Sequence, residues 1–106
     1  MPTVRRTAIF GQWLGQLGDG RAKAKIALRI DRLALGNPGD VKPIGGGLSE
    51  MRIDYGPGYR IYFGRRGEQL IILLCGGSKK SQRADIATAK QLFSDWIKTN
   101  DQDGSL

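Results

Sequence analysis

The stretch LSEMRIDYGPGYRIYFGRRGEQLIILLCGGSKK, residues 48–80, decides the fold of this chain. Residues 51–55 and 59–63 alternate in character on either side of Gly56-Pro57-Gly58, which is the pattern of a β-hairpin. Residues 70–75 are apolar throughout, which is typical of a central strand covered on both faces. The stretch predicts three antiparallel strands, to which residues 41–44 and 3–7 add two weaker strand candidates.

The register of the hairpin decides which side chains meet on the sheet. A three-residue loop that pairs Tyr55 with Tyr59 sets the facing pairs on the more polar side, which are Arg52 with Tyr62 and Asp54 with Arg60. The next strand makes this side partly apolar, so we expect it to be partly covered, with cationic groups at its edge. If the alternation continues beyond the strand, Lys79 lies on the same side.

Helical periodicity predicts three helices around this sheet. Thr7 can cap a first helix that stops at Gly18, and a second starts near Asp19 and ends at the breaker 36–39. The short connection between them predicts an antiparallel helical hairpin. Ser81 can cap a last helix, with Asp85 near its start. The inward-facing residues are Phe10, Trp13, Leu14, Leu17, Ala22, Ile26, Ile30, Leu33, Ile86, Ala89, Phe93 and Trp96.

These elements predict an α+β domain with an N-terminal helical hairpin and a C-terminal helix. The hairpin packs on a mainly antiparallel, twisted sheet of four to five strands. The length of 106 residues fits one domain, which we place at residues 1–100, with residues 101–106 as a frayed tail.

Composition excludes several classes of catalytic and metal site. The chain has no His and one Cys, so it lacks a Ser/His/Asp triad, a Cys/His dyad and a thiolate zinc site. Cys75 lies in the central strand and is interpreted as a small core residue. No apolar run reaches the roughly 18 residues of a membrane span, and no signal peptide is evident. We therefore expect a cytoplasmic protein with no membrane partner.

The net charge of +7 indicates an anionic partner. Residues 1–83 carry 15 basic and 6 acidic side chains, whereas residues 84–106 carry 2 basic and 4 acidic ones. We therefore expect the anion-binding surface on the body of the domain. From spacing alone, the favoured interpretation of the charged sheet face is structural: an Asp54–Arg60 ion pair, Arg52 stacked on Tyr62, and lysines in a solvated loop.

The whole pattern resembles the RelE/ParE toxin superfamily, and within it the HigB-like branch of phage-derived addiction-module killer proteins. The resemblance rests on GYRIYF after the GPG turn, on LIILLCGGSKK and on SQRADIATAK. It implies a RelE-like fold and a toxin that cleaves mRNA in the ribosomal A site and inhibits translation. It also implies a cognate antitoxin, with a helix-turn-helix fold, as a partner beside the ribosome and mRNA.

The resemblance implies catalytic roles for Arg60, Lys79, Lys80 and Arg52. Ribonucleolysis needs cations for the phosphorane charge and a base for the ribose 2′-hydroxyl, and a lysine crowded by other cations can serve as that base. Lys79 or Lys80 is therefore the candidate base, while both arginines suit charge stabilisation. Further candidate RNA contacts are Tyr62, Arg65, Arg66 and Arg83. We expect no cofactor and no metal, because that face offers only two acidic side chains.

A basic stripe on the second helix completes the candidate surfaces. Arg21, Lys25, Arg29 and Arg32 recur at helical spacing and could contact ribosomal RNA or an acidic antitoxin segment, although such stripes are more often solvated. Two other functions remain open. One is a ParE-like inhibitor of DNA gyrase, and the other is a catalytically inactive member that acts only as antitoxin partner and operon co-repressor.

Overall fold

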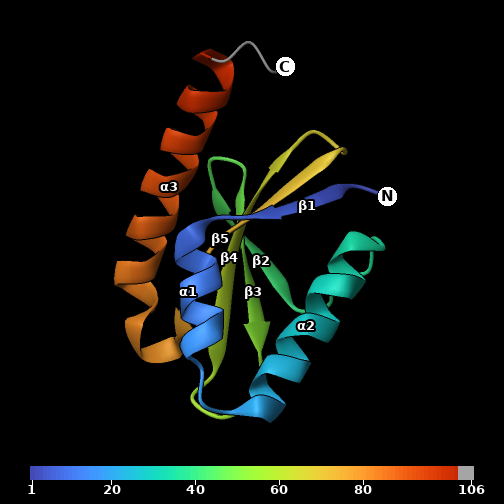
Figure 1. Ribbon diagram of the computed structural model, residues 1–106, viewed down its shortest axis with the longest axis vertical. Coiled ribbons are helices and arrows are strands. Elements are labelled where there is room, and N and C mark those ends of the chain that lie inside the picture. Colours follow the sequence, from blue (N-terminus) through green and yellow to red (C-terminus); the bar gives the residue numbers. More distant parts are fainter. Residues whose placement is uncertain (103–106) are drawn as a thin grey trace.

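The computed structural model describes the backbone of residues 1–102 and the side chains of residues 1–99. It has one five-stranded sheet with three α-helices around it (Figure 1). The fold is therefore the predicted α+β domain with a C-terminal helix. The elements are β1 (Thr3–Arg6), α1 (Ala8–Gln16), α2 (Gly20–Ala34), β2 (Val41–Gly45), β3 (Leu48–Ile53), β4 (Tyr59–Arg66), β5 (Leu70–Ser78), the 3₁₀ turn η1 (Lys79–Ser81) and α3 (Gln82–Gln102).

The strands lie in the order β1-β5-β4-β3-β2. Strands β2 to β5 form the predicted antiparallel meander, and β1 adds to its edge parallel to β5. Both weaker strand candidates are therefore confirmed. The central strand of the sheet is β4, which carries Arg60 near its start.

Helices cover both faces of the sheet, which gives the domain two hydrophobic cores. Helices α1 and α2 cover one face and α3 covers the other (Figure 1). The first core contains Phe10, Ile26, Leu33, Met51, Ile53, Ile61, Phe63, Ile71 and Leu73. The second contains Leu48, Tyr62, Ile72, Leu74, Cys75, Ala89 and Phe93. The inward faces predicted for all three helices are confirmed.

Both N-terminal helices begin at their predicted caps. The Thr7 hydroxyl accepts from the Phe10 N–H at 3.0 Å and donates to the Leu74 carbonyl at 2.6 Å, so it also ties α1 to β5. The Asp19 carboxylate accepts from the N–H groups of Arg21 and Ala22 at 3.0 and 3.2 Å. These contacts satisfy N–H groups that have no partner within the helix.

The last helix differs at both ends from the prediction. A 3₁₀ turn precedes it, and the Ser81 hydroxyl bonds with Ser78 and Asp85 instead of capping α3. At the other end α3 includes residues 101 and 102, which we had expected in the frayed tail, while residues 103–106 lie outside the described part of the chain. Among residues 1–102, none of the helices has the length and hydropathy of a membrane span.

The predicted hairpin register is wrong by two residues. Ile53 faces Tyr59 and Arg52 faces Arg60, because the loop has five residues, 54–58, instead of three. Tyr55 leaves the ladder: its ring packs against the first core and its hydroxyl donates to Asp19 at 2.9 Å. The shift is even, so each side chain keeps its predicted face while its neighbours across the strands change.

The turn after β4 predicts a pairing of Gly64 with Gln69, which would place Ile71 beside Tyr62 and Leu73 beside Arg60. This pairing is wrong, and Ile71 and Leu73 pack in the first core on the other face. Arg66 pairs with Leu70 across a tight turn, and a bulge opposite Tyr62 and Phe63 leaves Leu74 as the extra residue. Tyr62 therefore faces Cys75 and Arg60 faces Gly77. The side of the sheet that we expected to be partly covered is the second core, buried under α3.

Candidate functional site

Three of the four predicted catalytic side chains line one hollow at one end of the sheet. Arg52 comes from the end of β3, Arg60 from the start of β4, and Lys79 from η1 after β5. Figure 1 shows these strand ends close to the start of α3. The hollow has a volume of about 300 Å³, and Asp40, Asp54 and Gly58 complete its lining.

Gly58 fixes the approach of Lys79 to Arg60. The Lys79 N–H donates to the Gly58 carbonyl at 2.8 Å, which ties η1 to the hairpin loop. Gly58 has a φ of 75°, which favours glycine, and a Cβ there would lie 3.4 Å from the Lys79 Cβ and 3.5 Å from Arg60 Nη1. Glycine at this position therefore leaves room for Lys79 and Arg60 to lie close to the same part of the loop.

A buried carboxylate, Glu50, lies beneath the two arginines. Arg52 and Arg60 are cross-strand neighbours, and like charges in that position repel. Glu50 is 1% exposed; its Oε2 lies 3.2 Å from Arg52 Nε, and its Oε1 lies 3.8 Å from Arg60 Nε. The Tyr62 hydroxyl donates to the same carboxylate at 3.5 Å, and Gln82 Nε2 also donates to it. Glu50 thus offsets the repulsion between the arginines and connects them to α3.

Arg60 is held more tightly than Arg52. Its Nη1 donates to the carbonyls of Gly58 and Tyr59, both at 3.2 Å, and its side chain is 12% exposed. Its Nε is buried and has no hydrogen-bond partner, although it faces Glu50. The Arg52 side chain is 36% exposed. Arg60 is therefore a fixed cation at the wall of the hollow, and Arg52 is the more accessible one.

The structural pairings expected from spacing are not those observed. Arg60 pairs with Glu50 and not with Asp54, which is exposed at the rim of the hollow. Arg52 also pairs with Glu50, and the cross-strand neighbour of Tyr62 is Glu50. Glu50 is the residue that sequence reasoning missed in this role. Its alternation with Arg52 was a usable signal, but the incorrect register concealed its contact with Arg60.

The remaining candidate RNA contacts lie outside the hollow. Lys80 and Arg83 are exposed near the start of α3 but do not line the hollow. Arg65 and Arg66 lie at the other end of β4, on the order of 17 Å from Arg60 along the strand. Tyr62 is 0% exposed, so the structure does not fit the expectation that it stacks on a base. Burial also raises the pKa of its hydroxyl, which keeps it protonated.

The basic stripe on α2 divides into accessible and structural side chains. Arg21, Lys25 and Arg32 are exposed, with the Lys25 ammonium 5.2 Å from the centre of the Tyr55 ring. Arg29 instead donates to the carbonyls of Arg52, Pro38 and Asp40, at 2.7, 3.1 and 3.2 Å. Arg29 therefore anchors the backbone beside the hollow, and its guanidinium does not belong to a free basic surface.

Cys75, the one cysteine of the chain, lies in the second core. Cys75 is buried, and burial raises the pKa of its thiol to about 12, so it is a core residue as predicted and not a nucleophile. Residues 1–99 contain no group of three or more His, Cys, Asp or Glu side chains that could hold a metal ion.

Comparison with known proteins relates this chain to a protein family and to an individual protein. The family model described as phage-derived protein Gp49-like matches residues 12–94. An uncharacterized protein of Haemophilus influenzae is 49% identical over 89 residues, which cover 84% of this chain and 90% of that protein. The matched range includes α2, the whole hairpin, the hollow and most of α3.

Proposed function

This chain belongs to the phage-derived Gp49-like family, and from this premise we propose that it is the toxin of a bacterial toxin–antitoxin module. The family is toxin-like and related to addiction modules. In the proposed function the protein is a ribosome-dependent endoribonuclease that cleaves mRNA without a metal and so inhibits translation. Its cognate partner is a helix-turn-helix antitoxin.

The convergence of Arg52, Arg60 and Lys79 on one hollow carries this proposal. The three cations come from separate segments, and the Gly58 carbonyl accepts from both the Lys79 backbone N–H and Arg60 Nη1, which holds two of those segments together. Cations held in place before the reaction stabilise the extra negative charge of a phosphorane without reorganising. A fixed guanidinium also suits the geometry of a phosphate.

The reaction divides into roles that these residues can fill. The 2′-oxygen attacks the adjacent phosphorus and loses its proton to a base, while the bond from phosphorus to the 5′-oxygen breaks and that oxygen takes up a proton. Arg60 and Arg52 stabilise the phosphorane charge. Lys79 acts in proton transfer and is preferred over Lys80 because it lines the hollow. Asp54 adds a carboxylate at the rim that could accept the 2′-proton. The ribosome supplies the alignment of the message.

Controlled expression in bacteria tests the proposal. We expect induction to arrest growth and to produce new message ends within translated codons. Arg60→Ala is expected to reduce cleavage about 10²- to 10³-fold, as loss of a fixed charge-stabilising donor does. The matched control is Arg5→Ala, which removes an exposed arginine on edge strand β1, and this variant should cleave normally. Growth arrest with intact messages would contradict the nuclease, and an accompanying DNA-damage response would favour inhibition of gyrase.

The buried Glu50 supports a second candidate function. It pairs with both arginines, and Asp40 and Asp54 line the same hollow, so phosphate has to compete with carboxylates there. This arrangement would suit a catalytically inactive protein that acts with its antitoxin as a co-repressor. Two results together would favour this candidate. The wild-type protein would leave cellular messages intact, and the Arg60→Ala variant would still repress a reporter operon.

A further inference from the structure

Another hollow on the described surface lies away from Arg52, Arg60 and Lys79. It is a groove of about 520 Å³ between the second half of α3 and the turn that joins β2 to β3. Leu48, Phe93 and Ile97 give it an apolar lining, and Ser94 faces it from α3. Because Arg52 lies at the other end of β3 from Leu48, about 13 Å along the strand, the groove is separate from the candidate catalytic hollow.

The wall opposite α3 consists of glycine backbone. Gly45 and Gly46 line the groove and have φ values of 91° and 65°, so they form a tight turn without side chains. Phe93 is fixed by its packing, because a Cβ on Gly64 would lie 2.5 Å from its ring. The groove therefore has an apolar floor and one low wall.

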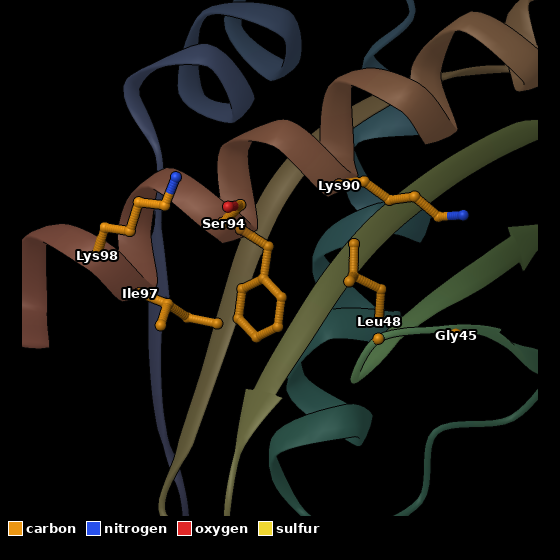
Figure 2. Close-up of a pocket in the computed structure, with 8 residues that line it drawn as sticks. Gly45, Leu48, Lys90, Ser94, Ile97 and Lys98 are labelled. Carbon is orange, nitrogen blue, oxygen red and sulfur yellow. The ribbon is translucent and has the colours of Figure 1, made fainter.

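The charged residues of the groove are all cations. Lys90 and Lys98 are exposed and line it, and its lining contains no acidic residue. Figure 2 shows them at the two ends of this part of α3, with Leu48 extending toward the helix below Lys90 in this view. Eight residues separate the two lysines, which is about 12 Å along the helix axis. Two acidic side chains on one partner chain, about two helical turns apart, match this spacing.

We propose that this groove binds an acidic amphipathic helix of a partner protein. Apolar side chains of the partner pack on Ile97 and on the small exposed parts of Leu48 and Phe93, which are 5% and 4% exposed. Carboxylates two helical turns apart pair with Lys90 and Lys98. Helices commonly bind in this way, with the apolar stripe in a groove and charges at its edges. The spacing of the lysines matches that of residues seven or eight apart on such a helix. The inference does not depend on nuclease activity.

A designed peptide tests the proposal on the full chain. The probe is an amphipathic peptide of about 18 residues, five helical turns, with a leucine stripe flanked by glutamates at heptad spacing. Its control is a shuffled peptide of the same composition, which has the same charge and no stripe. In a nuclear magnetic resonance titration we expect the probe to shift amide signals in residues 45–48 and 90–98, and to bind more tightly than the shuffled peptide.

Charge-reversal variants distinguish binding of the probe in the groove from its general electrostatic attraction to a basic protein. Lys90→Glu combined with Lys98→Glu is expected to weaken binding of the probe about tenfold or more. Arg5→Glu combined with Lys23→Glu changes the net charge equally outside the groove and should change binding by less than about twofold. Equal weakening by both double variants, tight binding of the shuffled peptide, or an absence of shifts at the groove would overturn the proposal.

Discussion

At the residue scale, Glu50 determines how Arg52 and Arg60 are arranged in the hollow. A buried carboxylate between two arginines can have either of two effects on an anionic substrate. It can hold the guanidinium groups in a productive position, or it can only cancel their charge. Glu50→Gln makes the site more positive in both cases. If Glu50 positions the arginines, the variant should cleave message more slowly, and if Glu50 only cancels charge, it should cleave faster.

We predict that Glu50→Gln lowers the rate of message cleavage about 10- to 100-fold while RNA binding is kept or strengthened, since small misplacements of catalytic groups are costly. Separate measurement of kcat and KM on ribosome-bound message checks this. The variant is also expected to lose about 1–3 kcal/mol of unfolding free energy, because the Arg52 guanidinium and the buried Arg60 Nε lose a charged partner. Faster cleavage by the variant would mean that Glu50 only cancels charge.

Asp19 makes the stability of the fold depend on pH at the acidic end. The hydrogen bond from Tyr55, followed by that from the Ala22 N–H, holds the pKa of the Asp19 carboxyl below its usual value. A lowered pKa in the folded state means that the carboxylate stabilises the fold above the unfolded pKa of about 3.9. This stabilisation is lost as the pH falls through the lower, folded pKa.

Asp19→Asn keeps an acceptor for the α2 N–H groups and removes the charge. We therefore predict that the wild type melts at a higher temperature than the variant near neutral pH, and that the difference shrinks as the pH falls below about 4. Thermal melts between acidic and neutral pH, followed by circular dichroism, measure it. A difference that stays constant over this range would show that the charge of Asp19 has no role.

At the scale of elements, the helices approach the sheet closely because glycines face them. A Cβ on Gly76 of β5 would lie 2.4 Å from the Trp13 ring of α1. We predict that Gly76→Ala lowers the unfolding free energy by about 1–3 kcal/mol, as overpacking does. Gly15→Ala on α1 is the matched control: a Cβ there would meet no atom within 4 Å other than its chain neighbours and the backbone of its own helix, so the substitution should be neutral or stabilising by up to about 1 kcal/mol. Denaturant titrations compare them, and equal effects would contradict this packing.

Helix caps and apolar faces could be predicted from the sequence because they depend on local spacing. Thr7 and Asp19 precede helical stripes, and the alternation in residues 51–63 fixes which face each side chain occupies. The register could not be predicted in this way, because it depends on Tyr55 leaving the ladder to reach Asp19, a residue 36 positions away. Because the predicted register was wrong, the contact between Glu50 and Arg60 was not predicted. The bonds of Arg29 to backbone carbonyls are likewise tertiary contacts that a helical stripe does not reveal.

At the scale of the whole molecule, the hollow and the groove lie at opposite ends of β3. Arg52 lines the hollow and Leu48 lines the groove. The two sites also differ in chemistry, since the hollow combines cations with carboxylates over a buried Glu50, whereas the groove is apolar between two lysines. A helix bound in the groove would therefore leave the hollow open to RNA.

The most direct test of the central claim uses purified protein, purified ribosomes and a defined message. The account predicts new message ends inside the codon at the ribosomal A site with the wild type, about 10²- to 10³-fold fewer with Arg60→Ala, and unchanged cleavage with Arg5→Ala. Without ribosomes the same message should remain intact. Wild-type protein that leaves ribosome-bound message intact, or cleavage that is unaffected by Arg60→Ala, would contradict the account.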